Sequence, residues 1–254
     1  MAEGFQLFSE FHYWIYGVVL SSARLFPAFL LFPFFSNSVV TDFSKYPIVF
    51  IVGAVLWPYS GEFIGSIEPI LYIGLLVKEL ITGLIIAMFI CLPIWVMHAA
   101  GSYIDNQRGA TLSSSLSPLS GVDSSELANL FNIFAAALIL ESGGLVIWLD
   151  MVTRSYVFWP PDVLTIPSLE EITGYITIMM LQAIRLSAPV ITMFLVAEVL
   201  LGLLARYTPQ LNAFALAMTV KSMIGFGILT LYFSPYLPAE IIKLLTYLSI
   251  DTLK

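Results

Sequence analysis

The sequence predicts an all-α protein of about six long, bent hydrophobic helices arranged as hairpins, of the kind found in membrane assemblies. Of its 254 residues, 59% are hydrophobic and only 11% are charged, whereas soluble domains carry about 25% charged residues. The mean hydropathy is +0.94, and several apolar runs reach the length of about 20 residues that a bilayer-spanning helix needs. Breaks rich in Pro, Gly, Asn or Ser separate these runs, as is typical of turns between helices.

The apolar runs give the expected helices in chain order. The second run is short, whereas the third and fifth are longer than a vertical span requires. Pro93 and Pro189 lie inside these two long runs and should bend them, because proline removes a helical hydrogen bond. The runs lie near 13–35, 47–60, 69–100, 127–149, 174–205 and 212–233, with an amphipathic tail after Pro238.

Composition and motifs exclude several classes of protein. The first 14 residues contain no Lys or Arg, so a cleaved signal peptide is not expected. The single cysteine, Cys91, cannot form a disulfide or a CxxC pair within the chain. The net charge of −7 argues against binding to nucleic acid, which needs a basic patch. Without a Cys/His cluster or an HExxH or GxSxG motif, we expect no metal, no cofactor and no catalytic residue.

Several ionisable side chains fall inside apolar runs, and we interpret them as residues of subunit assembly. A charge at mid-bilayer costs about 2.5–3.5 kcal/mol unless it faces protein, water or an opposite charge. These residues are scattered rather than stacked along one helix face, which favours pairs between helices and between subunits over an ion relay. They have few obvious partners within the chain, so neighbouring subunits are expected to supply them. The set comprises Arg24, Lys78, Glu79, Glu141, Arg185, Glu198 and Lys221.

Two apolar segments share a pattern of one carboxylate and one glycine. The segments LVKELITGL and LVAEVLLGL align without gaps and place a Gly four residues after the Glu. Residues four apart lie on the same face of a helix. We therefore expect Glu79 with Gly83, and Glu198 with Gly202, to face a closely packed helix that carries a partner for the carboxylate.

The least apolar stretch of its length, DNQRGATLSSSLSPLSGVDSSE at residues 105–126, lies between two very apolar runs. Gly109 and Gly121 relax the backbone at both ends, and Pro118 restricts the conformations between them. A plain solvated connector is one interpretation of this loop. The other is a segment at membrane depth, where irregular backbone is tolerated only if it is buried in protein or lines a water-filled cavity.

Six segments in order resemble the SctT/FliR (SpaR/YscT/EscT) family of type III secretion export apparatus proteins. They are ARLFPAFLLFPF, VKELITGLIIA, GSYIDNQRGAT, SPLSG, ESGGLVIWLDMVTRSYVFWP and LLARYTPQLNAFALAMTVKSMIG, and together they cover almost the whole chain. Flagellar members tend to have Asp-Gly-His near the end of the fourth helix, where this chain has Gly143-Gly144 after Ser142. This difference favours the injectisome branch over the flagellar branch.

The resemblance implies a core subunit of an export gate in the bacterial inner membrane, in part on its periplasmic side. One copy would join several SctR- and SctS-type subunits to form a pore for unfolded secreted proteins. SctU-type and SctV subunits, the inner rod, the needle base and membrane lipid would be its further neighbours. The resemblance makes 1–254 a single domain, with an SctR-like part (1–205) and an SctS-like C-terminal hairpin and tail (206–254). The turn between the last helices would contain Pro209, Gln210 and Asn212.

The family resemblance also assigns the polar loop the role of a plug that closes the pore. Leu112 and Leu116 could fill a constriction that closes by excluding water, while the hydroxyl groups of LSSSL could satisfy exposed backbone. Asp105, Gln107 and Arg108 would anchor the loop at its base. The plug would comprise Gly109, Ala110, Thr111, Leu112, Ser113, Ser114, Ser115, Leu116, Ser117, Pro118, Leu119, Ser120 and Gly121.

Two alternatives come from other functional classes. A secondary transporter or channel would also have bent helices and charged residues at mid-membrane, but the chain has no clear inverted repeat. An intramembrane aspartyl protease would need a GxGD motif besides the YID at 103–105, and that motif is missing.

Overall fold

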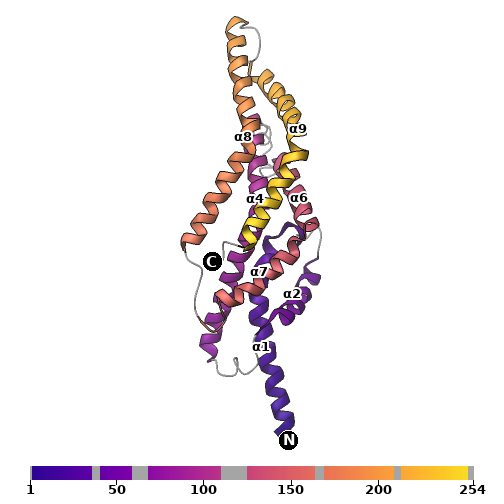
Figure 1. Cartoon of the computed structure of the whole chain (residues 1–254), viewed down its shortest axis with the longest axis vertical. Helices are drawn as coiled ribbons and strands as arrows, with labels where there is room; N and C mark the ends of the chain where they lie inside the picture. Colours follow the sequence, from indigo (N-terminus) through magenta and orange to yellow (C-terminus); the bar gives the residue numbers. More distant parts are fainter. Residues whose placement is uncertain are drawn as a thin grey trace. The chain divides into compact units, whose positions relative to one another are not determined.

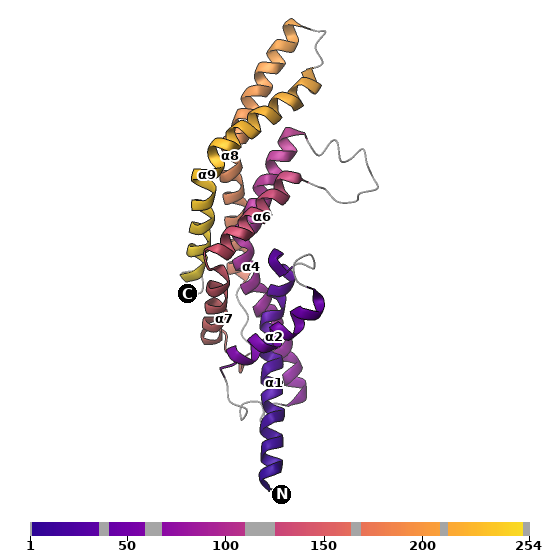
Figure 2. The same cartoon turned by 90° about the vertical axis from the view of Figure 1, so that its right-hand side faces the viewer.

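The computed structural model describes residues 2–35, 41–58, 68–109, 125–163, 169–208 and 213–250, and all regular structure among them is helical (Figures 1 and 2). This confirms the predicted all-α fold class. The helices are α1 (Ala2–Leu31), the 3-10 turn η1 (Pro33–Phe35), α2 (Asp42–Leu56), α4 (Pro69–Arg108), α6 (Glu126–Glu141), α7 (Gly144–Phe158), α8 (Leu169–Tyr207) and α9 (Ala213–Ile250).

Four of the described helices are long and apolar enough to cross a membrane. The bent pair α6–α7 makes a fifth candidate if the two helices form one span. These findings agree with the membrane class predicted from composition. The four candidate spans are Glu10–Leu31, Pro69–Arg108, Thr173–Tyr207 and Leu216–Phe233.

The single helix expected over 127–149 is in fact two helices. Helix α6 ends at Glu141, Ser142 caps it, and Gly143 has φ +81°. This left-handed conformation is easily adopted only by glycine, which ends one helix and allows the next to start in a new direction. The break therefore lies at the glycine pair in which this chain differs from the flagellar pattern.

The amphipathic tail expected after Pro238 is a continuation of α9, not a separate element. Both Pro235 and Pro238 lie inside this 38-residue helix. The buried face of the helix continues past both prolines, where it includes Leu237, Ile241, Leu244 and Leu245. Their spacing follows one helical face, so packing compensates for the hydrogen bonds that the prolines remove.

The chain forms two compact units, and each is assembled from separate stretches of sequence. Unit 1 comprises residues 1–91, 143–173 and 247–254, and unit 2 comprises 92–142 and 174–246. Unit 1 therefore contains α1, α2, the first part of α4, and α7. Unit 2 contains the rest of α4, α6, and most of α8 and α9.

In unit 1, α1 is the central helix. It runs parallel to α4, since the Tyr72 hydroxyl donates to the Tyr16 carbonyl and Arg24 contacts Glu79 further along both helices. Helix α7 runs antiparallel to α1, as contacts of Ser21 with Tyr156 and of Phe32 with Trp148 show. In Figures 1 and 2, α2 lies beside α1.

In unit 2, small residues bring the helices close together. Gly101 of α4 faces the backbone of Ala128 in α6, and Gly225 of α9 faces the ring of Phe194 in α8. The rings of Phe131 and Phe233 also pack at 5.8 Å between centroids, which joins α6 to α9. Each glycine admits a neighbouring helix that a larger side chain would push away.

Candidate functional site

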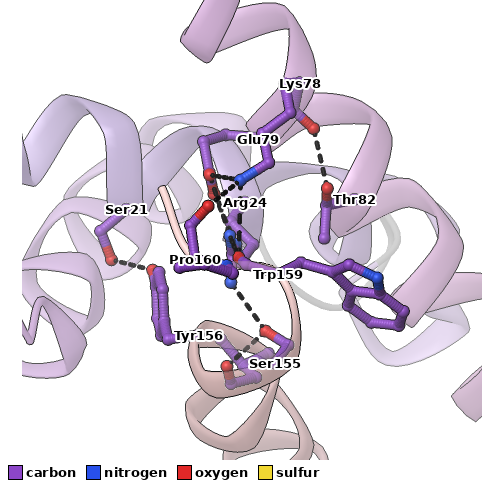
Figure 3. Close-up of polar contacts among 10 residues, drawn as sticks. Ser21, Arg24, Lys78, Glu79, Thr82, Ser155, Tyr156, Trp159 and Pro160 are labelled. Atoms are coloured by element: carbon purple, nitrogen blue, oxygen red, sulfur yellow. Dashed lines mark hydrogen bonds and ion pairs between the residues drawn. The ribbon is translucent and has the colours of Figure 1, made fainter. Parts of the chain in front are cut away.

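Unit 1 contains a buried cluster of three charged side chains at the contact of α1, α4 and α7 (Figure 3). Arg24 lies on α1, and Lys78 and Glu79 are consecutive residues of α4. Their exposed fractions are 1%, 1% and 0%. The sequence singled out all three residues, and the structure brings them together.

Arg24 donates four hydrogen bonds through its guanidinium. Its Nε donates to Glu79 Oε2 at 2.5 Å and its Nη2 donates to Oε1 at 2.8 Å, which makes a bidentate ion pair. Nη1 donates to the Ser155 hydroxyl and Nη2 also donates to the Trp159 carbonyl. The guanidinium carbon lies 4.0 Å from the centre of the Tyr156 ring. Arginine suits this position because its planar donors match a carboxylate while its face stacks on an aromatic ring.

Lys78 connects the same carboxylate to the end of α7. Its ammonium donates to Glu79 Oε1 at 3.0 Å and to the Pro160 carbonyl at 2.5 Å. The sequence Trp159-Pro160-Pro161 cannot continue the helix, so carbonyl groups at its end lack helical partners. Arg24 and Lys78 supply donors to these carbonyls from two other helices.

The cluster contains two cations and one anion, and the end of α7 helps to balance the extra positive charge. The C-terminus of a helix carries a partial negative charge, and here the carbonyls of Trp159 and Pro160 point at the cations. The exposed carboxylate of Asp162 also interacts electrostatically with Lys78. We conclude that the cluster joins three helices of unit 1 in a fixed arrangement.

Unit 2 has its own ionic contacts, which hold the end of α4. Lys221 of α9, 7% exposed, donates to Glu198 of α8 at 3.0 Å and to the Gln107 carbonyl at 3.2 Å. One ammonium group thus links three helices. Glu198 thus pairs with a neighbouring helix as expected, but its side chain is 57% exposed rather than buried. Gly202 faces open space, so the close packing expected at this position is not found.

Asp105 joins the two helices that flank the polar loop. Its carboxylate accepts from Arg108 at 2.7 Å, from the Ser125 hydroxyl at 2.7 Å and from the Leu127 amide at 3.0 Å. Ser125 in turn caps α6 by accepting from the Ala128 amide. The last turn of α4 and the first turn of α6 are therefore held together by one buried carboxylate.

Other predicted site residues lie apart from these clusters. Glu141 and Arg185 are exposed in this chain, and the ion pairs of the described residues include neither of them. The predicted plug lies outside the described residues apart from Gly109, which has φ +86°. Pro209, Gln210 and Asn212 also lie outside the described residues. Among the residues that the structure describes, no group of three His, Cys, Asp or Glu could hold a metal ion.

The structure narrows one expectation about the charges. Pairs between helices and pairs between subunits were both expected, with few obvious partners within the chain, and Arg24, Lys78 and Lys221 each form an ion pair with a glutamate of this chain. The partners of Arg24 and Lys221 are distant in sequence, 55 and 23 residues away, so spacing along the chain could not identify them.

Sequence reasoning also missed the contributions of α7 and its end. Ser155, Tyr156 and the carbonyls of Trp159 and Pro160 complete the first cluster. A signal for the carbonyls was present, because a Trp-Pro-Pro helix stop leaves acceptors that need donors from elsewhere.

Four of the described helices are apolar, long enough to cross a membrane and joined by ion pairs, which defines a helical membrane protein. Comparison with known proteins identifies its family. A family model for bacterial export proteins, family 1, matches residues 15–245. The chain belongs to this family, the SctT/FliR family of type III secretion export apparatus proteins. These proteins are membrane components of the apparatus rather than enzymes, so family membership disfavours both alternatives considered from the sequence.

The chain resembles individual relatives over most of its length. It is 39% identical over 240 residues to the surface presentation of antigens protein SpaR of Salmonella typhimurium, covering 94% of this chain and 91% of the relative. It is 41% identical over 218 residues to SpaR of Shigella flexneri, covering 83% and 84%. It is 34% identical over 163 residues to the Yop proteins translocation protein T of Yersinia pestis, covering 61% of each chain.

Proposed function

We propose that this protein is a core subunit of a type III export gate in the bacterial inner membrane. It joins SctR- and SctS-type subunits around a pore for unfolded secreted proteins, next to SctU-type and SctV subunits and below the inner rod and needle base. Its first 205 residues take the place of an SctR-like part and its last 49 that of an SctS-like hairpin. The observation that carries this proposal, besides the family, is the exposed apolar surface of α8 and α9.

Helices α8 and α9 bury little of their apolar surface within the chain. In the most apolar 18-residue stretch of each helix, only 17% is buried. Large side chains such as Leu200, Leu203, Met223 and Leu231 are more than half exposed. Such a surface must meet lipid or other subunits. Since the described cations Arg24, Lys78 and Lys221 are paired internally, this apolar area is now the main reason to expect partner subunits.

The injectisome is the form of apparatus that the similarities support. The relatives reported above are a surface presentation of antigens protein and a Yop translocation protein. The glycine pair at 143–144, which differs from the flagellar pattern, marks the break between α6 and α7. We propose that this chain has the same place in an apparatus that delivers proteins out of the cell.

We further propose that the loop from Gly109 to Gly121 plugs the closed pore. Its described flanks support this role, because Asp105 and Ser125 join the two helix ends from which the loop emerges. Lys221 also holds the Gln107 carbonyl at the last turn of α4. Asp105, Gln107 and Arg108 thus act as anchors that keep the base of the loop in place.

Co-purification in mild detergent tests the gate assignment. Expressed with candidate SctR- and SctS-type genes, the tagged chain should bring down both products in a constant ratio. Expressed alone, it should aggregate or be degraded, because α8 and α9 have no other cover. A stable, monodisperse monomer from cells without the partners would contradict the assignment, as would a homo-oligomer that excludes them.

Shortening the loop tests the plug. Deleting TLSSSLSPL (residues 111–119) should leave the complex assembled, because the segment has little apolar area with which to hold subunits together. Cells with the shortened protein should leak ions and small molecules in the absence of substrate. A cysteine in place of Ser114, in a Cys91→Ser background, should resist thiol reagents in the closed gate and react during export. If the shortened complex assembles without a leak and the cysteine reacts at all times, the loop is a solvated connector.

A further inference from the structure

One cation on α8 differs from the other charges inside the apolar helices. Arg24, Lys78 and Lys221 are buried and paired, whereas Arg185 is exposed. Among the described residues, none of the ion pairs includes Arg185. Within the described part of the chain, no carboxylate therefore forms an ion pair with Arg185.

Arg185 lies on a continuous apolar stripe of α8. The exposed residues Leu181, Arg185, Thr192, Val196, Val199 and Leu203 follow one another at intervals of three, four or seven, which places them on one side of the helix. The Thr192 hydroxyl donates to the Ala188 carbonyl within the helix, at 2.7 Å. Arg185 is thus the only side chain of the stripe with polar groups that need a partner outside α8.

Arg185 lies inside the candidate span Thr173–Tyr207, where contact with lipid tails is unfavourable for a charge. It lies about 24 Å from the first residue of α8 and about 33 Å from the last, at 1.5 Å per residue. Neither end of α8 is within reach of its side chain, so the free polar groups of the helix ends cannot supply a partner. An arginine inside an apolar span is found facing protein, a water-filled cavity or an opposite charge.

A protein partner with a carboxylate fits the stripe better than a water-filled pore does. Beyond Arg185 and Thr192, the stripe presents only Leu and Val side chains, which pack well against an apolar helix. A bidentate pair with Asp or Glu would satisfy the guanidinium as Glu79 satisfies Arg24. We infer that the Arg185 stripe is the contact face for an apolar helix of a neighbouring gate subunit, which presents a carboxylate to Arg185. This inference rests on the proposed gate function and names the kind of partner that covers α8.

Photo-crosslinking in the assembled complex tests which molecule covers the stripe. A benzophenone amino acid at Val196 should crosslink to a partner subunit. The crosslinked peptide should belong to an apolar helix that contains an Asp or Glu. The same amino acid at Met180 is the matched control, since Met180 is equally exposed but lies on the opposite side of α8. Crosslinks from Val196 to lipid, to a second copy of this chain, or to nothing would overturn the inference.

Charge substitutions test the carboxylate itself. Arg185→Leu should reduce the partner recovered by co-purification about tenfold or more, because it leaves a buried carboxylate unpaired. With Arg185→Lys, most of the partner should still be recovered. With Arg185→Glu, recovery of the partner should be lost, and it should return when the partner carboxylate identified by crosslinking is changed to Lys. If Arg185→Leu assembles as well as the wild type, the stripe faces lipid or water and the inference is wrong. If the wild-type complex forms no partner contact at all, the gate function itself fails.

Discussion

Glu79→Ala should destabilise the protein by about 3–5 kcal/mol, because it leaves two buried cations without their shared counter-ion. Arg24 and Lys78 both donate to this carboxylate, and its side chain is fully buried. The change can be measured as a loss of thermal stability of the complex in detergent, together with a lower steady-state level in cells. Glu79→Gln should be less harmful than Glu79→Ala, since the amide oxygen still accepts one hydrogen bond.

The matched control for this prediction is Asp150→Ala. Asp150 pairs with Arg154 at 2.8 Å on the surface of α7, with about half of each side chain exposed. Exposed pairs of this kind contribute about 0–1 kcal/mol. Equal stability of the Glu79→Ala and Asp150→Ala proteins would show that the buried cluster contributes nothing beyond a surface pair.

Gly83→Ala should destabilise unit 1, although alanine normally favours a helix. A Cβ at this position would overlap the backbone carbonyl of Arg24, so α1 and α4 would have to move apart. Overpacking in a tightly packed interior costs about 1–3 kcal/mol. The shift would also lengthen the contact between Arg24 and Glu79, because Glu79 lies one turn before Gly83 on α4. We expect a lower melting temperature and greater sensitivity to protease.

Gly74→Ala on the same helix is the control for Gly83→Ala. No atom lies within 4 Å of a Cβ added at Gly74, so the substitution should be neutral or should stabilise by up to about 1 kcal/mol. The two substitutions are chemically identical and differ in what surrounds them. Similar effects at both positions would contradict the close approach of α1 and α4.

The sequence predicted the helices well because apolar length is a local property. The expected run at 69–100 became α4 and the run at 174–205 became most of α8. The prediction failed at Gly143, where one residue in a left-handed conformation divides an apolar run. Apolar content does not change at this point, so a scan for hydrophobic segments cannot detect the break.

The candidate site was predictable in part. The pattern of Glu79 and Gly83 indicated a close helix with a partner for the carboxylate, and the structure identifies this helix as α1. Which helix would lie there depends on tertiary packing and could not be inferred from spacing along α4. The backbone carbonyls of Trp159 and Pro160 were missed for a related reason, since an acceptor of the main chain leaves no residue-specific signal.

The interleaved order of the two units affects how the chain is made. The Pro160 carbonyl that accepts from Lys78 lies 82 residues further along the chain. At about 5–20 residues per second, the ribosome needs about 4–16 s to synthesise that stretch. Throughout this interval Glu79 is the partner that the two cations share, and the carbonyls of Trp159 and Pro160 do not yet exist. The unfinished cluster carries one excess positive charge in an apolar setting, so early in biogenesis α1 and α4 depend on water, the insertion machinery or another protein to solvate it.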